Sequence, residues 1–206
     1  GLLNAGGSNV DDDGNYHPPH GKISITPCES SYIKEYWEND EYILETGGTT
    51  RECSLFGHHL SLTRTIKSKL GENTFEIHDV LSNNSSKATE FMLLYHFNFG
   101  FPFLTDDIKL KFPENKVTPR TPQAAEGLHE CNIITKPQED FYEHVFFRDM
   151  KDDNGIVTLM LENPALKIGV KFSYHKENLP VLAQWKSMQS GDYVLGIEPT
   201  NCYIKG

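Results

Sequence analysis

Short runs rich in Ile, Val, Phe and Tyr recur along most of the chain and strongly limit what it can fold into. From Gly21 onward, Gly, Asn, Asp or Pro separates these runs at intervals of about eight to twelve residues. Several runs alternate between apolar and polar positions, as in Leu60–Ile66. A period of two turns one face of a strand to a core and the other to solvent, and no long amphipathic helix is visible. The chain is therefore predicted to be all-β, an antiparallel sandwich or barrel.

Twelve runs are predicted to be strands, and one long polar stretch interrupts them. The predicted strands are Lys22–Thr26, Glu41–Thr46, Thr50–Phe56, His59–Lys67, Thr74–Leu81, Thr89–Phe99, Ile108–Phe112, His144–Asp149, Gly155–Glu162, Leu166–Tyr174, Val181–Lys186 and Tyr193–Glu198. The stretch Pro113–Asp140 is polar and aperiodic, and it is predicted to be a long surface loop with a function. Because 206 residues show no dividing linker and no internal repeat, we expect one domain spanning residues 1–206.

Charge and cysteine usage exclude several classes of partner and compartment. A formal net charge of −10 leaves no basic surplus to neutralise phosphates, so no nucleic acid is expected. No apolar run approaches the length of a membrane-spanning helix, so no membrane is expected either. The cysteines are scattered singly, which favours free thiols in a reducing cytoplasm over a disulfide framework. They are Cys28, Cys53, Cys131 and Cys202.

Two apolar stretches carry residues suited to acid–base chemistry. Met92–Pro102 is apolar apart from His96 and Asn98, and it is predicted to be a strand buried on both sides. Tyr193–Pro199 ends an apolar run with Glu198, where an idle carboxylate would be costly to bury. Histidine titrates near neutrality, and apolar surroundings raise a carboxyl pKa and improve it as a base. The structural alternatives are a hydrogen-bonded core histidine and an edge glutamate in a salt bridge.

These stretches and their surroundings resemble the galactose mutarotase-like superfamily of aldose 1-epimerases, in particular its bacterial branch described as DUF4432. The matching segments are His20-Gly21, Arg64–Gly71 with Asp79–Asn83, Leu94–Pro102 and Gly191–Cys202. The resemblance covers essentially the whole chain, and the last segment is long and specific. It implies an antiparallel β-supersandwich with a sugar site on a concave face of a sheet.

The resemblance also implies roles for individual residues. His96 matches the acid that protonates the ring oxygen of a pyranose, and Glu198 matches the base that takes the proton of the anomeric hydroxyl. The ring then opens, and the carbonyl rotates before the ring closes again. His20 matches a histidine that holds the sugar near its ring, and Glu143 stands where mutarotases carry a hydroxyl-binding aspartate. We expect His96 and Glu198 to face each other across a gap of roughly 5 Å plus a hydrogen bond at each end.

Further sugar-binding candidates have structural alternatives. Trp185 is suited either to stacking on an apolar sugar face or to the core. Arg64 and Arg148 are suited to forking onto hydroxyls or an acidic group of the sugar, or they are solvated strand residues. Asn98 is a candidate because it shares the predicted strand of His96.

The expected enzyme uses no cofactor and no metal. The alternative is a metal-dependent, cupin-like barrel that would use His17, His20 and a glutamate, but the chain has no H-x-H core. A second alternative is a non-catalytic carbohydrate-binding domain of the mutarotase fold. In either sugar-directed reading the partner is a monosaccharide or sugar derivative, whose identity depends on hydroxyl contacts from loops such as Pro113–Asp140.

The beginning of the chain departs from the family pattern. Members normally have strands before the His20-Gly21 turn, so the resemblance implies that an N-terminal part of the fold is missing, in a natural short form or a truncated product. Sheet edges left open in this way invite pairing with another copy, and a homo-oligomer is therefore one expectation.

Overall fold

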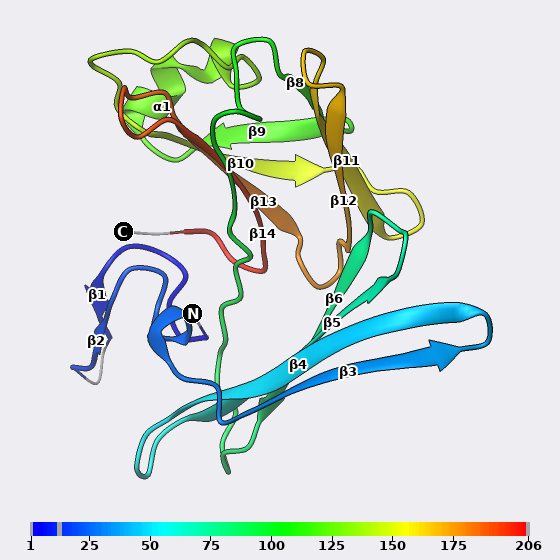
Figure 1. Cartoon of the computed structure of the whole chain (residues 1–206). Coiled ribbons are helices and arrows are strands. Elements are labelled where there is room, and N and C mark those ends of the chain that lie inside the picture. The colour runs from blue at the N-terminus through cyan, green and yellow to red at the C-terminus, as the bar shows by residue number, and fades with distance from the viewer. Residues whose placement is uncertain (1, 12–13, 205–206) are drawn as a thin grey trace. The chain divides into compact units, whose positions relative to one another are not determined.

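The structure is a computed structural model that describes residues 2–11 and 14–204, most of them in or between β-strands (Figure 1). Every paired strand within this part of the chain runs antiparallel to its neighbours, which confirms the predicted fold class. Helices are few and short, and none among the described residues could cross a membrane. The chain forms two compact units, one ending at Phe91 and the other beginning at Met92.

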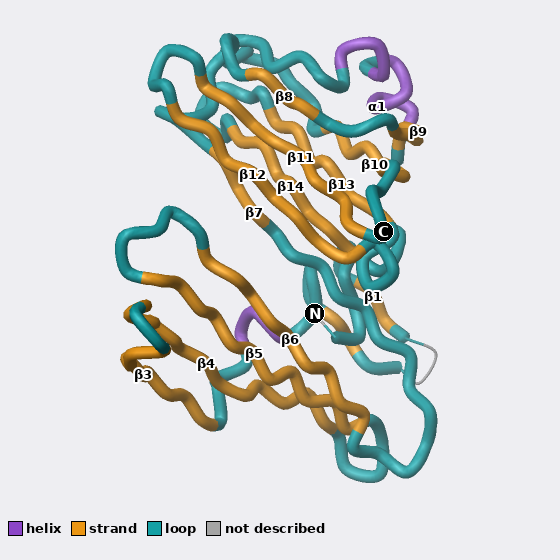
Figure 2. Tube along the Cα trace, turned by 90° about the vertical axis from the view of Figure 1, so that its right-hand side faces the viewer, coloured by secondary structure: helices purple, strands orange, loops and turns teal. Residues whose placement is uncertain are grey.

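The first unit contains a four-stranded sheet in the order β3-β4-β5-β6 and a short pair of strands, β1 and β2. Its elements are β1 (Asn9–Val10), β2 (Tyr16–His17), the 3₁₀ helix η1 (Ile23–Ile25), β3 (Ser30–Glu38), β4 (Glu41–Cys53), β5 (His59–Lys69) and β6 (Phe75–Asn83). Figure 2 shows the long strands of the sheet side by side. Tight turns join them, with Asn39 (φ +55°) after β3 and Gly71 (φ +86°) after β5, two residue types that tolerate left-handed backbone.

Several strand predictions in the first unit were wrong. Lys22–Thr26 contains η1 instead of a strand, and β3 was not predicted at all. The predicted strands Glu41–Thr46 and Thr50–Phe56 belong to the single strand β4, because Gly47 and Gly48 lie inside it and do not form a turn. A Cβ added at Gly47 would lie 2.5 Å from the carbonyl oxygen of Arg64 in β5 and 2.8 Å from the hydroxyl of Tyr32 in β3, so the glycine permits a close approach of both neighbouring strands.

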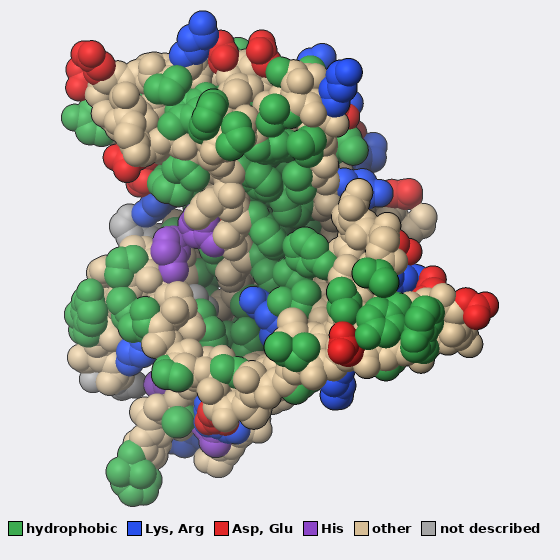
Figure 3. All heavy atoms as spheres, in the orientation of Figure 1, with side chains coloured by type: hydrophobic (Ala, Val, Ile, Leu, Met, Phe, Trp, Pro, Cys, Tyr) green, Lys and Arg blue, Asp and Glu red, His purple; other side chains and the backbone are tan. Residues whose placement is uncertain are grey.

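One end of the four-stranded sheet displays apolar side chains. In Figure 3 hydrophobic side chains gather where β3 turns into β4. Trp37 is 69 % exposed there and packs edge-on against Tyr42, with ring centroids 5.1 Å apart. Trp37 is therefore a surface residue.

The second unit consists of a five-stranded sheet and a three-stranded sheet. Their orders are β7-β14-β13-β10-β9 and β12-β11-β8. The elements are β7 (Phe97–Phe99), β8 (Lys109–Lys111), β9 (Asn115–Pro119), α1 (Pro122–Glu126), the 3₁₀ helix η2 (Leu128–Glu130), β10 (His144–Met150), β11 (Ile156–Asn163), β12 (Ile168–His175), β13 (Val181–Ser187) and β14 (Val194–Thr200).

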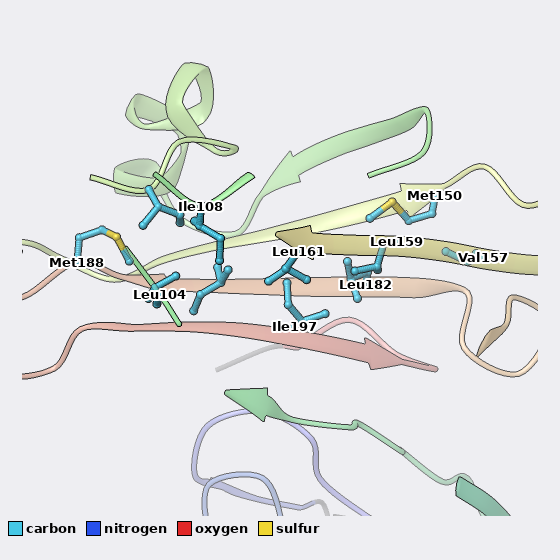
Figure 4. Packing of buried hydrophobic residues seen from close by; sticks show 11 residues of the cluster. Leu104, Ile108, Met150, Val157, Leu159, Leu161, Leu182, Met188 and Ile197 are labelled. Atoms are coloured by element: carbon cyan, nitrogen blue, oxygen red, sulfur yellow. The ribbon is translucent and has the colours of Figure 1, made fainter. Parts of the chain in front are cut away.

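The main core of the second unit joins these two sheets (Figure 4). Leu182 and Ile197 of the larger sheet pack with Leu159 and Leu161 of the smaller one, and all four are at most 1 % exposed. Because side chains alternate along a strand, residues next to Ile197 in β14 point to the opposite face of the larger sheet. That opposite face carries Glu198.

The two mid-chain stretches differ from their predictions. Within Met92–Pro102, only Phe97–Phe99 forms a strand, because the residues before it make isolated contacts with β14 and no continuous ladder. Within Pro113–Asp140 the structure contains β9, α1 and η2, so this stretch is partly ordered and not simply a surface loop. Its buried residues, such as Ala124 and Cys131, are too widely spaced to produce a periodic pattern.

Candidate active site

Glu198 occupies the interior of the five-stranded sheet. It lies in β14, between β7 and β13, and is 2 % exposed, so it is not an edge residue in a surface salt bridge. Its carboxylate lies against the backbone of Gly196, where an added Cβ would collide with Oε1 of Glu198 and lie 3.1 Å from Cβ of Trp185. The Gly-x-Glu spacing thus makes room for a buried carboxylate on this face of the sheet.

His96 is brought to Glu198 by backbone contacts that precede β7. The N–H of Tyr95 donates to the carbonyl of Pro199 at 3.0 Å. Two residues before Tyr95, the N–H of Leu93 donates to the side-chain oxygen of Asn201 at 2.7 Å. These bonds align the segment with β14 and place Nε2 of His96 3.3 Å from Oε1 of Glu198.

The close approach of His96 and Glu198 differs from the expected gap of a whole sugar ring. Both side chains lie together, as predicted, but they contact each other directly. The physical reason is that the hydrogen bonds of Leu93 and Tyr95 to the end of β14 hold the His96 backbone too close to Glu198 to leave a gap of that width.

Trp185 and Glu143 border this pair. Indole Nε1 of Trp185 donates to Oε2 of Glu143 at 2.8 Å. The Trp185 ring meets the His96 ring edge-on, with centroids 5.8 Å apart and an interplanar angle of 76°. Trp185 packs beside Val145 and Ala183 of a small apolar cluster on the Glu198 face, so it belongs partly to a core and partly to the site.

Burial raises the pKa of Glu198 to about 8, and the negative charge of Glu143 adds to this rise. The positive charge of Arg120 acts in the opposite direction and lowers the same pKa. The buried carboxyl therefore binds its proton more tightly than a solvent-exposed glutamate does. Among the described residues Oε1 of Glu198 makes no well-aligned hydrogen bond, although Nε2 of His96 lies 3.3 Å away, and this is unusual for a buried carboxyl oxygen.

The strand register places the other candidates of this unit. Asn98 pairs with Gly196 across β7 and β14, so its side chain is on the Glu198 face. Arg148 is wholly buried on the opposite face, where it is neither solvated nor directed toward Glu198. Its guanidinium donates to the side-chain oxygens of three amides: Gln184, Asn115 and Asn132.

His20 and Arg64 belong to the first unit. His20 has a left-handed backbone (φ +57°), and its Nδ1 lies 3.1 Å from the carbonyl oxygen of Ala5. Arg64 donates from Nε and Nη2 to both carboxylate oxygens of Asp79, at 2.8 and 2.7 Å. Much of the Arg64 guanidinium is therefore engaged within its own sheet. The sugar-binding roles of His20 and Arg64 stay predictions.

Arg120 was missed by sequence reasoning because it follows β9 inside the stretch expected to be a loop. A pocket of about 200 Å³ opens beside it in the second unit. It is lined by Arg120, Thr121, Gln123, Tyr142, Glu143 and Val145. Half-buried and exposed positions alternate along Asn115–Pro119 in the structure, but the mostly polar sequence of this segment gave no clear strand signal.

No group of three or more His, Cys, Asp or Glu side chains in the described part of the chain is arranged to hold a metal ion. The four cysteines are all free, as predicted. The chemistry available at this site is therefore that of a buried carboxyl in contact with an imidazole, bordered by an indole and a second carboxylate.

Residues 1–206 match the family described as "Domain of unknown function (DUF4432)". The chain belongs to the DUF4432 family. Its structure is similar to the crystal structure of "a putative aldose 1-epimerase" from Klebsiella pneumoniae, with a TM-score of 0.91 and 27 % sequence identity. The match covers 98 % of this chain and 53 % of that one, so the DUF4432 chain spans about half the length of the solved structure. No curated protein matches it.

These comparisons confirm the resemblance to the galactose mutarotase-like superfamily that the motifs indicated. The antiparallel fold of this DUF4432 chain is that of the aldose 1-epimerase structure.

Proposed function

We propose that the chain is a cofactor-free aldose 1-epimerase that opens and recloses a pyranose ring at the anomeric carbon. The observation that carries the proposal is the contact between Nε2 of His96 and Oε1 of Glu198 at 3.3 Å, on a sheet face bordered by Trp185. An imidazole and a carboxyl in contact can give one proton and take another within the span of one small substrate.

The reaction needs one proton to leave the anomeric hydroxyl and another to be added to the neighbouring ring oxygen. Glu198, as carboxylate, accepts the proton of the anomeric hydroxyl, and a carbonyl forms at the anomeric carbon. The bond between that carbon and the ring oxygen breaks with its electron pair on the ring oxygen, which takes a proton from His96. After the carbonyl rotates, the reverse steps close the ring on either face. Protons balance over the cycle, so no cofactor takes part.

The raised pKa of Glu198 suits this exchange. With one proton on the pair, the working arrangement is a protonated His96 and an ionised Glu198, which is one of two ways to share that proton. A substrate hydroxyl that donates to the buried carboxyl oxygen favours its ionised form. A base whose pKa lies near the operating pH accepts a proton readily and also releases it.

The neighbouring groups are suited to holding the sugar. Trp185 offers an apolar ring face, and Glu143, already bonded to its indole, accepts from hydroxyls of the reacting ring. Asn98 lies on the same face, and we keep His20 and Arg64 as proposed sugar contacts. Four free cysteines suit a reducing compartment such as the cytoplasm, and a net charge of −10 provides no basic surplus for nucleic acid.

The experiment that tests this function follows anomer exchange by NMR with a panel of freshly dissolved aldoses. We expect acceleration above the spontaneous rate for at least one sugar, and loss of that acceleration in Glu198→Gln. The control variant Glu162→Gln makes the same substitution on β11, at a side chain that pairs with Lys111. Its rate of anomer exchange should equal that of wild type. Sugar binding without exchange by wild-type protein would instead identify a carbohydrate-binding domain.

A further inference from the structure

We propose that the site holds two sugar rings, with a second ring in the pocket beside Arg120, so that the substrate is a reducing disaccharide or longer saccharide. This inference rests on the proposed function, because the first ring is the one placed at His96 and Glu198. The pocket of about 200 Å³ is lined by six residues of the second unit, and neither His96 nor Glu198 is among them.

The pocket and the site share a wall. Glu143 lines the pocket, bonds the indole of Trp185 at 2.8 Å and acts on the pKa of Glu198 through its charge. Val145 also lines the pocket and packs in the cluster that Trp185 borders. Arg120 is held beside Val145 by a backbone hydrogen bond of 2.9 Å to the carbonyl of Val145. Glu143 thus belongs both to the pocket wall and to the border of the His96–Glu198 pair, and a saccharide with one ring at His96 would extend past Glu143 into this pocket.

The chemistry of the lining favours a neutral ligand that is rich in hydroxyl groups. Arg120 supplies several donors and a positive charge, Glu143 supplies acceptors and a negative charge, and Gln123 supplies both a donor and an acceptor. A phosphate or carboxylate next to Arg120 would also lie near the carboxylate of Glu143, and like charges repel. Vicinal hydroxyls donate to the carboxylate and accept from the guanidinium, so a sugar satisfies both.

Size and shape support the same ligand. A volume of about 200 Å³ corresponds to roughly six or seven waters at about 30 Å³ each, enough for a hydroxylated ring and too much for a single anion. Tyr142 at the pocket is 80 % exposed. An aromatic ring presented to solvent beside polar groups offers a sugar an apolar surface for stacking.

The test compares anomer exchange of lactose and maltose with that of galactose and glucose. For wild-type protein we expect a higher kcat/KM for a disaccharide than for the monosaccharide at its reducing end. Arg120→Lys keeps the charge felt by Glu198 but loses the forked geometry, and it should lower the disaccharide value about tenfold more than the monosaccharide value. Gln123→Ala should act in the same direction. Lys116→Arg, a cation exchange at an exposed position of β9, should leave the ratio unchanged.

Three outcomes would overturn the proposal of a second ring. The first is a disaccharide kcat/KM no higher than that of the monosaccharide, and the second is a ratio of these two values that does not change in Arg120→Lys and Gln123→Ala. The third is a higher kcat/KM for hexose 6-phosphate or galacturonate than for both disaccharides. If no sugar is exchanged, the proposed function fails, and calorimetry with the same four sugars decides the pocket separately. Tighter binding of a disaccharide that is lost in Arg120→Lys would still support it, and its absence would end it.

Discussion

Nε2 of His96 lies 3.3 Å from Oε1 of Glu198, although the two residues come from widely separated parts of the chain. Backbone bonds from the segment before β7 to the end of β14 hold this distance, and the missing side chain of Gly196 leaves space for the carboxylate. The imidazole and the buried carboxyl are close enough to titrate as a coupled pair, so their properties should be measured together.

Removing either member of the pair should abolish most of the exchange activity. Glu198→Gln and His96→Asn keep similar shapes and should each lower kcat by at least about 10²-fold, while sugar binding by calorimetry is largely kept. The double variant should cost clearly less than the product of the two single effects, because the residues act together. Fully multiplicative effects would show that His96 and Glu198 serve separate purposes.

The rate should depend on pH through Glu198. Its pKa of about 8 in the free protein marks the pH above which the pair no longer holds its shared proton. We expect kcat/KM to fall above about pH 8, where that proton is lost, and to fall at low pH, where the pair binds a second proton, which gives a bell-shaped profile. A kcat/KM that stays constant from about pH 7 to about pH 10 would argue against Glu198 as the base.

Stability should depend on pH through the same carboxyl. Its pKa is raised on folding from 4.5 to about 8, so the folded state binds a proton that the unfolded state has released between these values. The free energy of unfolding should therefore be highest, as far as Glu198 contributes, below about pH 4.5 and should decrease as pH rises through 8. Glu198→Gln removes this loss, so its stability relative to wild type should grow by on the order of a few kcal/mol from pH 5 to 9. Parallel chemical unfolding curves across this range would contradict the burial of Glu198.

Gly196 should be needed for positioning, although it has no reactive group. Gly196→Ala places a methyl group where the carboxylate of Glu198 now lies, and it should lower kcat by about 10- to 100-fold, since small displacements of a catalytic group are costly. The pH profile should shift as well, because the carboxyl changes its surroundings. Gly100→Ala is the matched control, with its added carbon 3.7 Å from the carbonyl of Tyr193. Equal kinetics for the two variants would contradict this role.

Arg148 should contribute to stability and not to catalysis. Arg148→Met leaves the buried side-chain oxygens of Gln184, Asn115 and Asn132 without this donor, and it should lower the free energy of unfolding by about 2–4 kcal/mol. Arg51→Met removes a partly exposed pair with Glu29 and should cost at most about 1 kcal/mol. Chemical denaturation measures both, and a loss in Arg148→Met no larger than that in Arg51→Met would contradict the structural role.

Much of the fold and part of the site could be predicted from the chain. Alternation identified β5, β6 and most strands of the second unit, because one face of each strand must be buried. Predictions failed where local signals conflicted with packing: Gly47 and Gly48 suggested a turn but lie within β4. The sequence did not point to Arg120, because the strand that precedes it, β9, is short and the neighbouring residues in the chain are polar.

The sequence by itself determined that the chain is an antiparallel β protein and which residue types were available for acid–base chemistry, because periodicity and titration behaviour are local properties. Only the tertiary structure decided that His96 and Glu198 touch, that Arg148 is buried on the opposite face from Glu198, and that Arg120 borders a pocket next to Glu143. These facts depend on strand order and register, which set the neighbours and the face of every side chain and arise from pairing between distant segments.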